Sequence, residues 1–360
     1  MNFRFQISDF RWVAVALAAA GLTLTGCNKE KEQAATPTPE VVKSAALTPW
    51  PATPPANPNM LPPTKAAPKT VAPGPAEIWK EFSGERAFEE ARKQIEIGPR
   101  PSGTPEIDKA RALIEDGLRR NGWEVERQIF TDETPRGPVK FVNLIGRFSP
   151  TGKSPAPRDS QRAIVCSHYD TKRFSTIRFL GASDGASSTG ALIELARVLA
   201  LDAALAAKIE LVFFDGEEAF VQFTSPDDPK PDGLFGSRFY ANQLRDKGRA
   251  AQFKFGILWD MIGDRDLTIT LSPDSPPDLT REILASAETL ALRQHFGRNE
   301  TSILDDHVPL NRVRIPTIDL IDFDYPAWHT ADDNLEHIAP ESLQKIGAVT
   351  LHHLRKALGK

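Results

Sequence analysis

The chain has 360 residues, of which 40% are hydrophobic and 26% charged, and its formal net charge at pH 7 is −4. This length allows one large globular domain with additional segments. The slightly negative charge argues against the basic surface that nucleic-acid binding needs, so we expect no nucleic-acid partner. The two cysteines, Cys27 and Cys166, cannot form a framework of several disulfides, so the fold is not expected to depend on them.

Residues 1–27 have the features of an export signal. Two arginines precede an apolar stretch at 12–22 that is too short to span a bilayer. The following Leu24-Thr25-Gly26-Cys27 resembles the lipobox of bacterial lipoproteins, in which the cysteine is lipidated and becomes the mature N-terminus. We therefore expect an exported protein that contacts the membrane only through lipid on Cys27, with the outer membrane or periplasmic side favoured. An ordinary cleaved signal peptide is the alternative.

Residues 28–76 contain 12 of the 30 prolines, together with many alanines and threonines. A segment of this composition cannot bury a core, and it is expected to stay extended as a tether. The remaining residues, 77–360, are expected to form the catalytic domain.

The pattern of this domain alternates between helices and strands. The predicted helices cover 85–97, 105–121, 186–207, 235–246, 278–295 and 340–358. The predicted strands cover 123–130, 141–148, 163–167, 211–214, 255–259, 267–271 and 315–321. This alternation predicts a single α/β domain with a central, mostly parallel, twisted sheet flanked by helices on both faces.

The most informative stretch is Leu211 to Glu218, where four apolar residues are followed by three carboxylates and one glycine. The apolar run predicts a buried strand, and α/β sheets place their ligands at the carboxyl ends of strands. Close carboxylates repel one another unless a cation or shared protons hold them. A metal bound by one carboxylate, with its neighbour as general acid or base, explains the stretch. A solvated acidic loop is the alternative.

Similar residues follow the other predicted strands. His168 and Asp260 come directly after two of them, and His329 follows a loop after the last strand. Asp184 precedes the long predicted helix, where it could simply cap the N-terminus. Each residue alone has such a structural explanation, but together they gather at one edge of the sheet. Histidine and carboxylate ligands from several strand ends suit a catalytic zinc site.

These residues carry a family resemblance. The motifs, in chain order, are His168-Tyr169-Asp170, Ser183-Asp184-Gly185, Phe213 to Phe220, Asp260, Asp305-Asp306-His307 and Trp328-His329-Thr330. Their order resembles the zinc-aminopeptidase superfamily, and within it the glutaminyl-peptide cyclotransferases, over roughly residues 85–358. The resemblance implies one zinc ion held by Asp184, Glu218 and His329. A second ion is possible through His168 and Asp260.

The resemblance also implies the reaction, which converts an N-terminal glutamine of a peptide or protein into pyroglutamate and releases ammonia. Zinc would polarise the side-chain amide, and Glu217 would transfer the proton. Asp260 and Asp305 would form an acidic pair that shares a proton. The substrate pocket would be lined by Trp328, Phe223 and His168, and a monomer is expected.

Two positions depart from the family pattern. Asp319 stands where animal cyclases have a histidine, and Phe223 stands where tryptophan is usual. Both departures concern substrate preference and rate more than the fold.

Three other interpretations stay open. A zinc aminopeptidase with one or two ions would use the same ligands, with Asp184 bridging the metals and Glu217 activating water. The run Gly181 to Gly185 matches the nucleophile elbow of serine hydrolases, but this leaves Glu217 and Glu218 without a role. A non-catalytic binding protein would be expected to lose a ligand, and none is lost.

Overall fold

The chain is described by a computed structural model that covers residues 74–149 and 162–359. The predicted export signal with Cys27, and nearly all of the predicted tether, lie outside these residues. Among the helices in these two ranges, none combines the length and the apolar character needed to cross a membrane.

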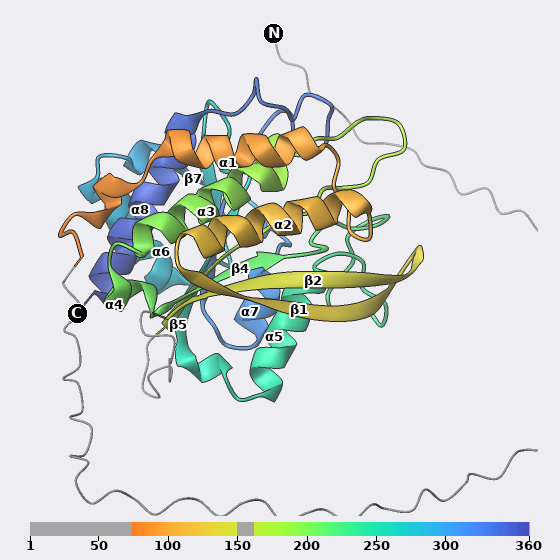
Figure 1. Cartoon of the computed structure of the whole chain (residues 1–360), viewed down its shortest axis with the longest axis horizontal. Helices are drawn as coiled ribbons and strands as arrows, with labels where there is room; N and C mark the ends of the chain where they lie inside the picture. The colour runs from red at the N-terminus through yellow and green to blue at the C-terminus, as the bar shows by residue number, and fades with distance from the viewer. Residues whose placement is uncertain (1–73, 150–161, 360) are drawn as a thin grey trace, which may run out of the picture. The chain divides into compact units, whose positions relative to one another are not determined.

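A six-stranded sheet forms the centre of the domain, with the strand order β1-β2-β4-β3-β5-β8 (Figure 1). Its strands are β1 (Trp123–Thr134), β2 (Gly137–Phe148), β3 (Arg162–His168), β4 (Ile209–Phe214), β5 (Phe253–Asp260) and β8 (Thr317–Ile321). β1, β2 and β4 are antiparallel neighbours, whereas β4, β3, β5 and β8 run parallel to one another. The four parallel strands therefore end at one edge, and the predicted fold class is confirmed.

Helices cover both faces of this sheet. One face packs against α1 (Gly84–Ile97), α2 (Pro105–Arg120), α3 (Ser188–Leu199), α6 (Pro277–Thr289) and α8 (Pro340–Leu358). The other face packs against α5 (Phe235–Asp246) and α7 (His307–Arg312), which lie on the opposite side of the sheet from α1, α2 and α3 in Figure 1. The shorter elements are η1 (Ile78–Glu81), η2 (Ala182–Ser187), α4 (Ala203–Ala206), η3 (Ala250–Gln252), η4 (Arg293–His295), and the parallel pair β6 (Ile269–Leu271) and β7 (Phe296–Arg298).

The central strands are apolar on both sides because both sides are covered. In β3, Val165 belongs to the larger core beneath α1, α3 and α8, while Ile164 and Cys166 belong to the core beneath α5 and α7. Successive side chains of a strand point to opposite faces, so a strand buried on both faces becomes a continuous apolar run. This is why the predicted strands at 163–167 and 211–214 lack alternation.

Two predicted helices are too long. The helix predicted at 186–207 ends at Leu199, and Asp202 starts α4 by accepting a hydrogen bond from the Leu205 N–H at 3.1 Å. The backbone of Asp202, with φ −127° and ψ 88°, is not helical and separates the two helices. The helix predicted at 278–295 ends at Thr289, because Ala291 adopts a φ of 56° that an α-helix excludes.

His353, on the buried face of α8, makes the domain sensitive to acid. Its ring lies edge-on to Phe255 at 4.9 Å, and burial, with nearby Lys254 and Lys356, lowers its pKa to about 4. The unfolded chain takes up this proton near pH 6.5, so the stability present above that pH is lost as the pH falls toward 4. We predict that this group alone lowers the free energy of unfolding by about 2 kcal/mol between pH 8 and pH 5.

Urea unfolding at both pH values measures this difference. The variant His353→Gln should lose correspondingly less stability in acid than the wild-type protein. His337→Gln, at an exposed histidine, serves as the control and should behave like the wild type. An equal loss in wild type and His353→Gln would contradict the assignment.

Candidate metal centre and active site

Asp184, Glu218 and His329 meet at the carboxyl edge of the sheet. Each offers a donor atom, and the three atoms lie within 4.8 Å of one another. The Nε2 atom of His329 is 3.3 Å from Glu218 Oε1 and 3.5 Å from Asp184 Oδ2. Two carboxylates and one imidazole from three separate segments match the donors of a catalytic zinc site, which keeps a further position for substrate. These residues therefore fit the ion that the sequence motifs imply.

The charges of the two carboxylates also favour a cation. Burial and the nearby Glu218 raise the pKa of Asp184 to about 7. Burial opposes the ionisation of Glu218 as well, but His329 and Lys172 outweigh it, so its pKa is lowered. Lys172 contributes through its Nζ atom, 3.2 Å from Glu218 Oε2. A divalent ion between Asp184 and Glu218 would keep both carboxylates ionised.

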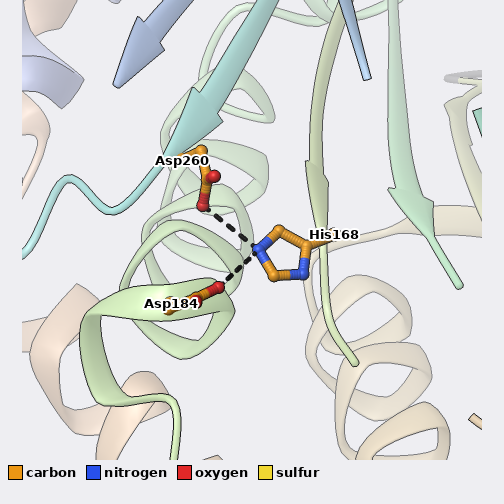
Figure 2. Close-up of side chains that lie close together, drawn as sticks. All are labelled: His168, Asp184 and Asp260. Carbon is orange, nitrogen blue, oxygen red and sulfur yellow. Dashed lines mark hydrogen bonds and ion pairs between the residues drawn. The ribbon is translucent and has the colours of Figure 1, made fainter. Parts of the chain in front are cut away.

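A second donor set shares Asp184. Figure 2 shows the ring of His168 between Asp184 and Asp260, with Nε2 3.2 Å from Asp184 Oδ1 and 3.1 Å from Asp260 Oδ1. The other ring nitrogen faces Asp170 Oδ1 at 3.6 Å. Burial disfavours the charged ring, yet the surrounding carboxylates raise its pKa well above the ordinary value. The imidazole thus lies against three carboxylates.

A cavity of about 200 Å³ lies beside these groups. The carboxylates that line it are Asp184, Glu217, Glu218, Asp260 and Asp305. Its walls are apolar and include Phe223, Met261, Ile321 and Trp328. Trp328 stacks on the ring of His329, with centroids 4.3 Å apart. His168 was expected to line the substrate pocket, but it is fully buried behind Asp184 and Asp260 and does not line the cavity.

Glu217 lines the cavity but is not part of either donor set. Burial raises its pKa well above the ordinary value, and the charges of Glu218 and Asp305 act in the same direction. A carboxyl group with a raised pKa beside a metal site has the properties of a general acid and base. Of the two adjacent glutamates, one therefore offers a ligand and the other a proton carrier.

Asp305 leads from the cavity to a buried group that contains Asp319 and His307. Burial raises the pKa of Asp305 well above the ordinary value, and the charges of Asp319 and Asp260 raise it further. Asp319 lies with its Oδ2 atom 3.5 Å from His307 Nδ1. The residue that departs from the animal pattern thus sits where it can hydrogen-bond with Asp305, and protons shared in this group relieve its repulsion.

Three further carboxylates hold this site together, and sequence reasoning assigned them no role. Asp170 accepts the backbone N–H groups of Glu217 and Glu218, at 3.2 and 3.4 Å. Asp333 accepts those of Ser183 at 2.7 Å and Asp184 at 3.2 Å. Asp232 accepts hydrogen bonds from three backbone N–H groups of the loop that carries Phe223, at 2.8 to 3.1 Å. Asp170 belongs to the quoted motif His168-Tyr169-Asp170, which was the only signal for it.

Arg100 also holds the site together without a role predicted from the sequence, and it is fully buried. Its guanidinium donates to the carbonyl oxygens of Tyr169 at 2.9 Å, Leu180 at 2.8 Å and Gly181 at 3.0 Å. It thereby joins the end of β3 to the turn that presents Asp184. No short motif marks an arginine that acts through backbone carbonyls.

Comparisons with known proteins agree with this geometry. Peptidase family M28 matches residues 143–354, more than half of the chain. The glutaminyl-peptide cyclotransferase of Drosophila melanogaster is 30% identical over 283 residues, 71% of this chain and 76% of that protein. The crystal structure of a glutaminyl cyclase from an Acidobacteriales bacterium is 31% identical, with a TM-score of 0.68 over 82% of this chain and 99% of that one. A Zn-dependent exopeptidase from Parabacteroides distasonis is 26% identical, with a TM-score of 0.66 over 78% and 99% of the two chains.

Asp333 gives a test of the metal centre. Asp333→Asn keeps the size of the side chain but replaces one of the two oxygens that accept the N–H groups of Ser183 and Asp184. We predict a zinc affinity about 10- to 100-fold weaker, because Asp184 loses its backbone support. Chelator competition measures the dissociation constant. The neighbouring Asp332 is exposed, so Asp332→Asn is the matched control. Wild-type affinity in a folded Asp333→Asn would overturn the role.

Proposed function

The chain belongs to peptidase family M28 and, within it, to the glutaminyl-peptide cyclotransferases, and we propose that it converts N-terminal glutamine into pyroglutamate with release of ammonia. The observation that supports this reaction best is one narrow cavity that joins a proton carrier, Glu217, to the donor set of a metal. Its small volume suits one terminal residue. Its apolar walls suit the aliphatic part of the glutamine side chain.

We assign one zinc ion to Asp184, Glu218 and His329. A zinc ion bound there supplies a Lewis acid for the side-chain amide of the substrate. The donor chemistry supports this assignment, as does the raised pKa of Asp184, which a cation would reverse.

The residues of the chain account for the proton transfers. The α-amine of the terminal glutamine attacks its own side-chain carbonyl, so the reacting groups are already held in one residue. Glu217 takes a proton from the amine and gives it to the departing nitrogen, which leaves as ammonia. One C–N bond forms, one breaks, and no water is consumed. We assign Asp260 and Asp305, which both line the cavity, as the acidic pair, and Trp328 and Phe223 form part of its apolar wall.

A zinc aminopeptidase is the second candidate. The observation that favours it is the donor set of His168, Asp184 and Asp260, which could hold a second ion with Asp184 as the bridge (Figure 2). The likeness to glutaminyl-peptide cyclotransferases and to a glutaminyl cyclase structure weighs against this. We therefore favour one ion and the cyclase reaction.

The location of the protein is proposed from sequence alone. We infer export and lipid attachment at Cys27, with a monomeric catalytic domain held at the cell envelope by residues 28–76. Incorporation of a labelled fatty acid should be lost in Cys27→Ser, and retained label would exclude this attachment site.

The products distinguish the two reactions. We predict that the zinc-loaded full chain removes one ammonia from a peptide that begins Gln-Ala and leaves its backbone intact. A peptide that begins Leu-Ala should remain unchanged. Mass spectrometry of both mixtures gives the answer directly. Release of free leucine or glutamine would replace the cyclase with the aminopeptidase.

Glu217→Gln provides the matched variant, because it keeps the shape of the side chain and removes its proton chemistry. We expect turnover to fall by about two to four orders of magnitude, which is the usual contribution of a general acid and base, while zinc binds as before. Loss of zinc in this variant would make Glu217 a ligand and would contradict its assigned role.

A further inference from the structure

Tyr325 occupies a buried position behind the apolar wall of the cavity. Its ring packs in one cluster with Met261, Ile303 and Ile321, which line the cavity, whereas Tyr325 does not. A buried tyrosine usually directs its hydroxyl to a hydrogen-bond partner. Here the hydroxyl donates to Asp333 Oδ1 at 2.9 Å. The proton transfers proposed above make no use of this contact.

Asp333 connects this contact to the metal centre. The oxygen that accepts the tyrosine hydroxyl also accepts the Ser183 N–H at 2.7 Å, and the other oxygen accepts the Asp184 N–H at 3.2 Å. Because Asp333 is fully buried, the loss of one of these hydrogen-bond partners is costly. The position of its carboxylate therefore determines the position of the turn that presents Asp184.

The same hydroxyl closes the loop that carries another ligand, His329. This residue has a φ of 55°, in the left-handed region that residues other than glycine seldom adopt. Such a conformation persists only where the surrounding structure holds it. The Trp328 N–H donates to the Tyr325 carbonyl oxygen at 3.2 Å, and the Tyr325 hydroxyl joins the start of the loop to its end at Asp333. One side chain thus supports the segments of two metal ligands.

We propose that Tyr325 is a positioning residue for the reaction, and that its hydroxyl, through Asp333, holds Asp184 and His329 in one arrangement. The inference rests on the proposed metal centre and cyclase function. Tyr325 belongs to neither donor set and does not line the cavity, so it acts on the ligands of the metal and not on the substrate. A phenylalanine in its place would keep the ring in the cluster and remove only the hydrogen bond.

The test introduces Tyr325→Phe into the full chain. We expect the dissociation constant for zinc, measured by chelator competition, to rise roughly tenfold, because a metal ligand loses support from behind. With cobalt in place of zinc, the visible absorption bands should shift, since they report the arrangement of the ligands. At saturating zinc, kcat for ammonia release from a Gln-Ala peptide should fall severalfold. KM should stay within about twofold, because the cavity lining is unchanged.

Tyr240→Phe is the matched control. Tyr240 on α5 is similarly buried, and its hydroxyl donates to Glu210 at 2.6 Å. Glu210 lies at the amino end of β4, whereas Glu218 follows the carboxyl end of that strand. The control removes one buried hydrogen bond, as the test variant does, and thermal unfolding compares their stability. It should keep the zinc affinity, the cobalt spectrum and the kcat of the wild type.

A double variant tests the route through Asp333. Tyr325→Phe and Asp333→Asn disturb the same hydrogen bonds, so their joint effect on zinc affinity should be smaller than the product of the two separate effects. Effects that multiply fully would overturn this route. Unchanged zinc affinity and cobalt spectrum in Tyr325→Phe, or equal changes in Tyr240→Phe, would overturn the positioning role. Both readouts are independent of turnover, so a wild-type protein that releases no ammonia would overturn the cyclase function alone.

Discussion

The repulsion among buried carboxylates at one edge of the sheet governs the rest of this structure. The buried members are Asp170, Asp184, Asp215, Glu217, Glu218, Asp260, Asp305, Asp306 and Asp319. Burial raises the pKa of Asp184 and Asp306 to about 7, and those of Glu217, Asp305 and Asp319 well above the ordinary value. Such a group is stable only with cations, shared protons and hydrogen-bond donors. Different residues around this edge of the sheet supply the cations, the shared protons and the hydrogen-bond donors. Their positions decide which carboxylates form the site.

The parallel strands are the reason that the charges meet. β3, β4, β5 and β8 end at one edge, so His168, Glu217, Glu218 and Asp260 lie side by side although long stretches of sequence separate them. Buried arginines and backbone N–H groups bind the carboxylates outside the cavity lining, as Arg111 does for Asp215. The carboxylates that line the cavity accept few hydrogen bonds from the protein. That difference distinguishes the groups that support the site from those that take part in chemistry.

The sequence predicted the strands of the central sheet, the fold class and the charged residues that line the cavity, because apolar runs followed by acidic residues are local signals. It did not predict β7 or the apolar wall residues Met261, Ile303, Leu304, Ile321 and Phe323. It did not predict the roles of Asp170, Asp232 and Asp333, since their partners are backbone N–H groups distant in the chain or unmarked by residue type. The break before Asp202 was missed because a long alanine-rich pattern favours one helix. His168 was expected at the pocket wall, and its burial depends on packing that no motif records.

Asp319 adds one more carboxylate to the buried acidic group that contains Asp305. Protons shared between Asp319 and Asp305 relieve this repulsion, and we propose that one divalent ion is bound among the carboxylates that line the cavity. Crystals of the zinc-loaded protein, measured on both sides of the zinc absorption edge, test this most directly. The account predicts a single anomalous peak between Asp184, Glu218 and His329. An equal peak beside His168 and Asp260, or none between the three expected ligands, would contradict it.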